Sequence, residues 1–305
     1  MKITFGLILG LTIGCSGGNS YISKSDTETD TGLTDTGADS DEDTDSGDDT
    51  DPVDTDSAED SGDTGTGEPE ICKNDYHPVH LSGWTKTFEA TYEGGSGTAT
   101  EEALPETSWH GRDVYSYRDT MSVMVDNILG MPEEKGWSNT MFISCSEEDG
   151  MYLNGWTGTI TNDGFDLATF QNYDSDVETD FGTGHLYLPY EFAVGAIGSW
   201  NNSYTLIVTK TDPTSGAQTN TRAVTSIHNE VGFVPYSLFD GSSAEAYKIV
   251  YEMTITDDLG QAENNYVEQY WVRGLGMVQE DFLDNDGAIL LSKVLSSYSG
   301  LTIIE

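Results

Sequence analysis

Apolar and polar side chains alternate in two separate stretches of the chain, and this alternation constrains the fold more than any other feature of the sequence. Residues 84–92 read WTKTFEATY and residues 247–255 read YKIVYEMTI. In a β-strand, side chains two apart share a face, whereas an amphipathic helix needs a period near 3.6. Both stretches therefore predict strands with one aromatic face and one polar face.

Further apolar runs predict more strands at residues 114–117, 141–145, 151–158, 186–190, 204–209, 223–228, 266–273 and 288–298. Residues 120–129 are the best candidate for an amphipathic helix. Several strands at short spacing are typical of an antiparallel arrangement. The predicted fold class is mostly β, with a single antiparallel curved sheet or half-barrel, and a β-sandwich is the alternative.

Turn residues separate these runs. Glu148-Asp149-Gly150 is typical of a tight hairpin, and the sequence DDLG at residues 257–260 turns out of another strand. Gly274 and Gly276 indicate a reversal that needs positive φ. The three aspartates within residues 281–287 predict a polar hairpin turn rather than a calcium loop, because an aromatic residue interrupts the ligand spacing.

The first fourteen residues have the layout of a secretory signal. Lys2 is followed by an uncharged apolar run, which is shorter than the roughly 20 residues that span a bilayer. The run ends LTIGCS, with a small residue directly before Cys15. This sequence resembles the bacterial lipobox, although that family usually has Leu three residues before the cysteine, where this chain has Thr12.

The resemblance implies that residues 1–14 are removed and that Cys15 carries acyl chains such as palmitate, which hold the protein to a membrane. Ser16, rather than an aspartate, follows the cysteine, and the resemblance then implies sorting to the outer membrane of the cell envelope. An ordinary secretory signal, with Cys15 unmodified, is the alternative.

Residues 15–70 are predicted to form a disordered tether. From residue 26 to residue 70 there are nineteen Asp or Glu residues and no Lys or Arg, and most of the others are Thr, Ser, Gly and Ala. Such a segment cannot bury enough apolar surface to offset its ordering entropy, and like charges keep it extended. Asp41, Asp43 and Asp45 alternate like the first ligands of a calcium loop, but a serine stands where the glycine of that loop belongs. The expected role of this segment is therefore to let the domain reach away from its anchor, with calcium binding or glycosylation as alternatives.

Residues 71–305 are predicted to form one mostly-β domain, because no linker rich in Pro, Gly or charge divides them. This part carries 35 acidic and ten basic residues. Such an excess of negative charge repels nucleic acid and anionic lipid, and no basic stripe offsets it. Nucleic acid is therefore excluded as a partner.

Two cysteines remain after Cys15, at positions 72 and 145. In an exported protein, two cysteines commonly form a disulfide. A bond between Cys72 and Cys145 would close a loop of about 74 residues and would stabilise the domain by about 4 kcal/mol. We therefore predict this disulfide.

No motif for catalysis or cofactor binding is found, so we expect no cofactor and no enzymatic activity. His77 and His80 lie close together, but no third metal ligand is near, and they are interpreted as exposed polar residues. The remaining histidines are scattered, and no nucleophile or phosphate-loop motif accompanies them. With 35 acidic residues in the domain, no spacing singles out a catalytic carboxylate pair.

Six tryptophans lie in or beside the predicted strands. Aromatic side chains fill β interiors efficiently, so most are expected in the core. Some could instead line a ligand cavity or form a flat surface on which a sugar stacks. The candidates for ligand-lining residues are Trp84, Trp156, Trp200 and Trp271.

The last third of the chain contains a second resemblance. It runs Gly198-Ser199-Trp200, then Ala246–Ile249, then the sequence YWVRGLGMV at residues 270–278, and ends with residues 290–298. This order is similar to that of a large group of mostly uncharacterised bacterial envelope lipoproteins, which are distantly similar to the lipoprotein-carrier fold. The resemblance implies a strongly curved antiparallel sheet that cups an apolar ligand, and its motifs mark strands and turns rather than chemistry.

Three functions are carried forward from the sequence. The first is a non-enzymatic lipoprotein, anchored to a membrane through Cys15, whose sheet binds an apolar or extended ligand, such as a lipid, or a protein partner. The second is an adhesin or carbohydrate-binding module on a long tether that binds a glycan. The third is a hydrolase whose site is assembled from distant carboxylates or histidines.

Overall fold

The computed structural model describes residues 75–304, except for 93, 128–129, 147–148, 167, 170, 191, 194–197 and 258. The predicted signal, the predicted lipidation site Cys15, the predicted tether and Cys72 lie outside these residues, so the structure does not test them. No helix in the described ranges has both the length and the apolar character needed to cross a bilayer.

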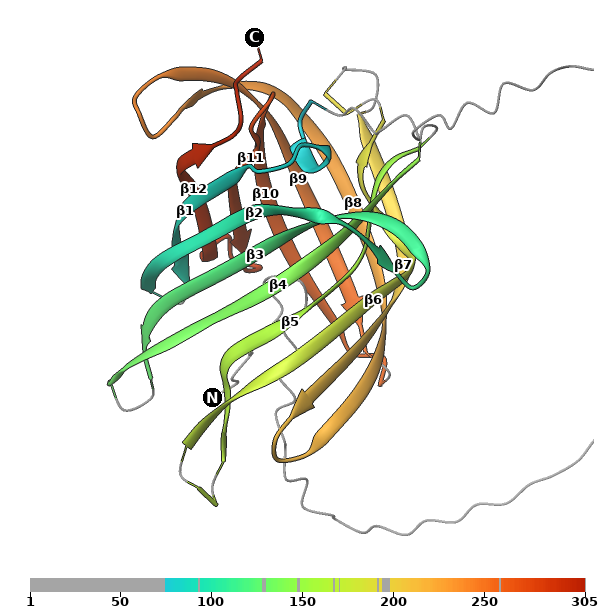
Figure 1. Ribbon diagram of the computed structural model, residues 1–305, viewed down its shortest axis with the longest axis vertical. Helices are drawn as coiled ribbons and strands as arrows, with labels where there is room; N and C mark the ends of the chain where they lie inside the picture. Colours follow the sequence, from blue (N-terminus) through green and yellow to red (C-terminus); the bar gives the residue numbers. More distant parts are fainter. Residues whose placement is uncertain are drawn as a thin grey trace, which may run out of the picture. The chain divides into compact units, whose positions relative to one another are not determined.

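Twelve antiparallel strands in the described part of the chain close into one barrel (Figure 1). Each strand pairs with the next along the chain, and β1 closes the barrel by pairing with β12. A short 3-10 turn, η1 (Pro78–His80), precedes the first strand. The strands are β1 (Thr85–Tyr92), β2 (Gly95–Trp109), β3 (Arg112–Asp126), β4 (Pro132–Ser146), β5 (Gly150–Asp166), β6 (Gln171–Pro189), β7 (Ser199–Asp212), β8 (Gly216–Ser237), β9 (Ser243–Thr256), β10 (Ala262–Val272), β11 (Gly276–Leu283) and β12 (Ile289–Ser299).

The predicted fold class is confirmed, and the curved antiparallel sheet goes on to close on itself. Closure follows from the pairing of β1 with β12, which leaves neither of these two strands as an open edge of the sheet. Each of the ten predicted strands lies within or overlaps an observed one. The turn around Gly150 and the turn at 257–260 join successive strands, and Gly274 and Gly276 have the expected positive φ, +82° and +81°.

The best candidate for a helix, residues 120–129, does not form one, because residues up to Asp126 belong to β3. Met121, Val123 and Val125 are buried, and the residue directly after each of them is exposed. This is the period of a strand, and it allows three apolar side chains to enter the barrel. The apparent helical pattern came from exposed apolar residues such as Met124, which is 50% exposed on the outer wall.

Two strands were not predicted. The inner face of β2 carries Gly97, Ala99 and Glu101, so small and charged side chains conceal the apolar alternation. β11 is buried on both faces, so it shows no alternation at all. Its outer side is covered by the hairpin of β8 and β9, which arches over β10–β12 at the top of Figure 1. The hydroxyl of Tyr236 in that hairpin donates to Oε1 of Gln279 at 3.2 Å.

Large side chains fill the inside of the barrel. Trp84, Phe88, Trp156 and Trp271 are each at most 1% exposed, and they belong to one continuous core cluster. Burying several such aromatic side chains supplies a large part of the hydrophobic free energy of a β domain. The barrel is therefore a packed core rather than an open tube.

Pairing between β6 and β7 is incomplete. It covers only Asp176–Asp180 of β6 and Ile207–Thr211 of β7. Farther along the seam, the Asn202 side chain replaces the missing strand pairing. Its Oδ1 accepts from the N–H of Leu186 at 3.1 Å, and its Nδ2 donates to the carbonyl oxygen of the same residue at 3.1 Å. One side chain thus bonds to both backbone groups of Leu186, and the carbonyl oxygen also accepts from the indole N–H of Trp200 at 3.3 Å.

Candidate functional site

A ladder of charged side chains lies on the inner face of β1, β2 and β3. Lys86 is directly opposite Glu101, and Glu101 is directly opposite Asp119. Nζ of Lys86 lies 2.5 Å from Oε2 of Glu101 and also donates to the carbonyl oxygen of Met277 at 3.2 Å. Side chains directly opposite each other on one face interact strongly, and these are buried. Strand pairing alone therefore assembles the ladder.

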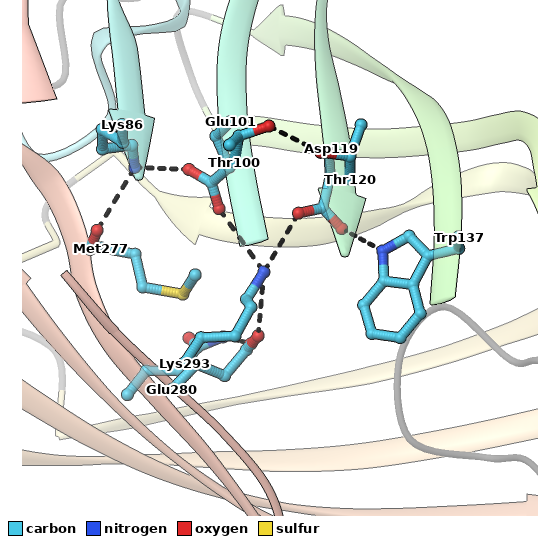
Figure 2. A network of polar contacts seen from close by, with 10 residues as sticks. Lys86, Thr100, Glu101, Asp119, Thr120, Trp137, Met277, Glu280 and Lys293 are labelled. Carbon is cyan, nitrogen blue, oxygen red and sulfur yellow. Dashed lines mark hydrogen bonds and ion pairs between the residues drawn. The ribbon is translucent and has the colours of Figure 1, made fainter. Parts of the chain in front are cut away.

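Lys293 of β12 reaches the ladder from the other side of the barrel closure (Figure 2). Its Nζ lies 3.2 Å from Oδ1 of Asp119, 3.6 Å from Oε1 of Glu101 and 3.8 Å from Oε2 of Glu280. Ala90 is opposite Lys293 on β1, and its small side chain leaves room on the inner face. One ammonium group therefore contacts three carboxylates.

Neighbouring neutral groups complete this network. The indole N–H of Trp137 donates to Oδ2 of Asp119 at 2.7 Å. The Nε2 of Gln269 donates to Oε1 of Glu280 at 2.6 Å, and its Oε1 accepts from the indole N–H of Trp271 at 3.2 Å. Buried charges are tolerated when they are both paired and hydrogen-bonded, as these are.

The pKa values of the charged groups in this network are shifted in different directions. Burial opposes ionisation of Glu101, but the Lys86 and Lys293 ammonium groups outweigh it and lower the pKa of Glu101. Burial also opposes the charge on Lys293, but Asp119, Glu280 and Glu101 outweigh it and raise the pKa of Lys293. Burial raises the pKa of Glu280, and Lys293 only partly offsets this. Of the two glutamates Glu101 and Glu280, Glu280 is therefore the one that takes up a proton first.

A cavity of about 100 Å³ borders the network inside the barrel. Its lining includes Glu280, Lys293 and three tyrosines, Tyr117, Tyr187 and Tyr251. Burial above all raises the pKa of these tyrosines, so their hydroxyl groups stay protonated. The space is enough for a few water molecules at about 30 Å³ each, and it falls short of the roughly 300–1,000 Å³ of typical ligand pockets.

Three histidines are buried around this interior. The ring of His228 is stacked between Trp200 and Tyr251, with ring centroids 4.6 and 4.5 Å away. Burial lowers the pKa of His77 to about 3, of His185 to about 4 and of His228 to about 2. All three are therefore neutral at physiological pH, and they fill space as aromatic rings.

A groove of about 820 Å³ lies at the end of the barrel where the chain enters at Asp75 and leaves after β12. Its size is that of a typical ligand site. Arg273 and Asp75 form an ion pair at its rim, with 2.6 Å between Nη2 and Oδ2. The apolar lining consists chiefly of Tyr76, Tyr190, Phe192, Phe233, Val272, Ile303 and Ile304.

The structure separates the predicted ligand-lining tryptophans from this groove. Trp84, Trp156 and Trp271 are at most 1% exposed, and Trp200 is 8% exposed. None of the four lines the groove or the central cavity, and Trp271 borders only a void of about 10 Å³. In the described part of the chain these side chains occupy core positions, and their role in lining a ligand site stays a prediction.

The other sequence-based candidates lie as follows. Cys145 is partly buried in β4, and its predicted bond to Cys72 stays a prediction. His77 is 7% exposed, so its interpretation as an exposed polar residue is wrong; its ring contacts Trp271 at a centroid distance of 5.9 Å. In the described ranges, no group of three or more His, Cys, Asp or Glu side chains has the arrangement of a metal site.

One sequence signal pointed to the buried network. Lys86 falls on the aromatic face of the first predicted strand, where a lysine requires a buried partner. The partners could not be identified, because Glu101 and Glu280 lie on the two strands that were not predicted. No pattern in the sequence indicated the groove. Its lining comes from segments far apart in the chain, namely the residues before β1, the β8–β9 hairpin and the C-terminal segment.

Comparison with known proteins gives only remote likenesses. No family model matches the chain, and no curated protein is similar to it. A protein from Bacteroides fragilis, described as exported and as having a YmcC-like fold, is 14% identical with a TM-score of 0.42, over 72% of this chain and 96% of that chain. A protein from Parabacteroides distasonis, described as a lipoprotein, is 11% identical with a TM-score of 0.37, over 72% of this chain and 95% of that one. Similarity this low does not establish a shared function.

Proposed function

We propose that this protein is a non-enzymatic lipoprotein of the bacterial outer membrane, anchored through Cys15, and that it binds an extended or apolar ligand or partner in the groove at the end of its barrel. The observation that carries the binding role is the groove itself, with its volume of about 820 Å³ and its aromatic lining. Anchoring rests on the lipobox-like sequence before Cys15.

The groove is favoured over the barrel interior as the binding site. The interior leaves only about 100 Å³, and aromatic side chains occupy the rest. In the groove, Tyr190, Phe233 and Ile304 are 64, 48 and 42% exposed. Exposed apolar side chains gathered in one hollow are typical of binding sites.

The carboxylates of the interior support a structural role rather than hydrolysis. Glu101, Asp119 and Glu280 are each bound by Lys293, and the adjacent cavity is too small for a typical substrate. The main argument for a sugar-binding role was that tryptophan side chains could stack on a sugar. All six tryptophans are at most 8% exposed, which weakens this argument.

Native mass spectrometry of the full-length protein, extracted from its own membrane in detergent, tests the proposal. We expect an additional non-covalent mass that disappears on denaturation. The variant Ser242→Trp places a large side chain in the groove and should lose this mass, whereas Ser203→Trp, at an exposed site on β7, should keep it. A bare protein mass, or equal retention in both variants, would contradict the binding role.

A further inference from the structure

β9 extends beyond β10 at the rim of the groove. Its pairing with β10 ends at Ala246, which is opposite Val272. Its pairing with β8 continues to Ser243. Residues 243–245 therefore form a strand edge with β8 on one side and the groove on the other.

The register of the β8–β9 hairpin determines where the backbone groups of this edge point. The N–H of Leu238 donates to the carbonyl oxygen of Ser242 and closes the turn. In an antiparallel pair, hydrogen-bonded and non-hydrogen-bonded positions alternate from such a closing pair. Ala244 is two residues beyond Ser242, so its backbone bonds across to β8.

Ser243 and Glu245 lie at the alternate positions, so their N–H and C=O groups point away from β8. Pro235, which has no N–H to donate, is opposite Glu245, as expected for a position without hydrogen bonds to β8. In the described part of the chain, strand pairing on this outward side ends with Ala246 opposite Val272, a register that directs the C=O of Glu245 toward the N–H of Arg273. The N–H and C=O of Ser243 and the N–H of Glu245 lie beyond this last pair. An unpaired edge of this kind is a template for a further strand.

The charge around the edge indicates what kind of strand fits. Glu245 and Asp75 line the groove, and Arg273 is paired with Asp75, so the rim has a net negative charge. Residues 71–305 have 35 acidic and ten basic residues, which repel an acidic partner and attract a basic one. The apolar lining adds places for the alternate side chains of an extended segment.

We propose that residues 243–245 of β9 bind an extended, net-basic polypeptide segment as an additional strand in the groove. This deepens the proposed function and rests on it, since it names the class of partner for the same groove. The main chain of the partner forms hydrogen bonds with both backbone groups of Ser243 and with the N–H of Glu245, and its basic side chains meet the acidic rim.

The test uses full-length protein in detergent and three fluorescently labelled octapeptides. The first alternates Lys and Val, the second alternates Glu and Val, and the third repeats the Lys-Val sequence with N-methyl groups on alternate amides. Fluorescence anisotropy should give saturable binding of the Lys-Val peptide. We expect the acidic and the N-methylated peptides to bind at least about tenfold more weakly, because one or two hydrogen bonds or charge contacts are lost.

The variant Glu245→Pro removes one outward N–H, and it leaves β8 pairing intact because position 245 makes no bond across to Pro235. It should weaken Lys-Val binding about tenfold relative to Glu245→Ala, which has the same charge but keeps the N–H. Ser243→Pro is the second variant if Glu245→Pro does not fold. Glu106→Ala, at an exposed site on β2, controls for general loss of negative charge.

Equal binding of the methylated and unmethylated peptides would overturn strand addition. No binding of any octapeptide, together with a lipid mass that Ser242→Trp abolishes, would reject the polypeptide partner while keeping the groove as the binding site. If no octapeptide binds and no additional mass is found, the inference and the proposed function are rejected together.

Discussion

Nζ of Lys293 lies 3.2 Å from Oδ1 of Asp119, although the two residues are 174 positions apart in the chain. Lys293 is on the last strand and Asp119 is on the third, so their contact spans the closing pair of strands β1 and β12. A charge pair buried at this place depends on the barrel being closed. It links the two ends of the sheet by more than backbone hydrogen bonds.

The substitution Lys293→Met should destabilise the protein by about 3–5 kcal/mol, because it leaves buried carboxylates without a counter-charge. The free energy of unfolding from urea denaturation measures this. The double variant Lys293→Met with Asp119→Asn should recover part of the loss. A change below about 1 kcal/mol in the single variant would show that the pair is not buried as described.

The substitution Glu280→Gln should stabilise the protein at pH 8. Burial raises the pKa of Glu280 above its ordinary 4.5, so the folded protein binds this proton more tightly than the unfolded chain. The corresponding stability is present below about pH 4.5 and is lost as pH rises through the folded-state pKa. Glutamine stays neutral, so its advantage in unfolding free energy should be larger at pH 8 than at pH 4.5; an advantage independent of pH would be inconsistent with a raised pKa.

The substitution His185→Phe should make the protein less sensitive to acid. Burial lowers the pKa of His185 from 6.5 to about 4, so its stability contribution is present above pH 6.5 and is lost as pH falls toward 4. Within that window each such group contributes a slope of about 1.4 kcal/mol per pH unit. Unfolding free energies measured at pH 7, 6 and 5 should show a slope reduced by this amount, and an unchanged slope would mean that His185 is accessible to protons.

The substitution Asn202→Ala should open the seam between β6 and β7. It removes the acceptor of the Leu186 N–H and one of the two donors to the Leu186 carbonyl oxygen, at a cost of about 1–3 kcal/mol. Hydrogen exchange of the Leu186 amide should be faster in this variant. Asn201→Ala is the matched control, because Asn201 is exposed on the outer face of the same strand; equal effects of the two changes would remove the role assigned to Asn202.

The substitution Cys15→Ser should release the protein from membranes. Without the thiol, no lipid can be attached, and the remaining charge of the chain disfavours anionic lipid surfaces. Cell fractionation and intact mass distinguish the two forms. Wild-type protein found in the soluble fraction with no added lipid mass would show that Cys15 is unmodified.

The sequence was most informative where one face of a strand is apolar and the other is polar. In β1, buried Phe88 and Ala90 alternate with more exposed residues such as Glu89, and this single pattern identifies both the strand and its buried face. β11 has no such contrast, because the β8–β9 hairpin covers its outer side. Its strand character depends on a contact between distant segments, which periodicity does not encode.

Neither the buried network nor the groove could be predicted from the sequence, and the reason is similar. Glu280 and Lys293 are directly opposite each other, but this register is fixed by the hairpin and by the barrel as a whole. Closure of the barrel is equally non-local, since it requires the first strand to pair with the last. Alternation predicts that a side chain faces inward without identifying the side chain it meets there.

The central claim, that the groove and not another surface binds a partner, is tested most directly by photo-crosslinking in cells. Phe233 lines the groove and is 48% exposed, and Phe165, near the end of β5, is 51% exposed and is not part of the groove lining. Each is replaced in turn by benzoylphenylalanine, which reacts with adjacent C–H bonds on irradiation. The account predicts a discrete crosslinked species from position 233 and none from position 165. Crosslinks that are absent from position 233, or the same from both positions, would contradict it.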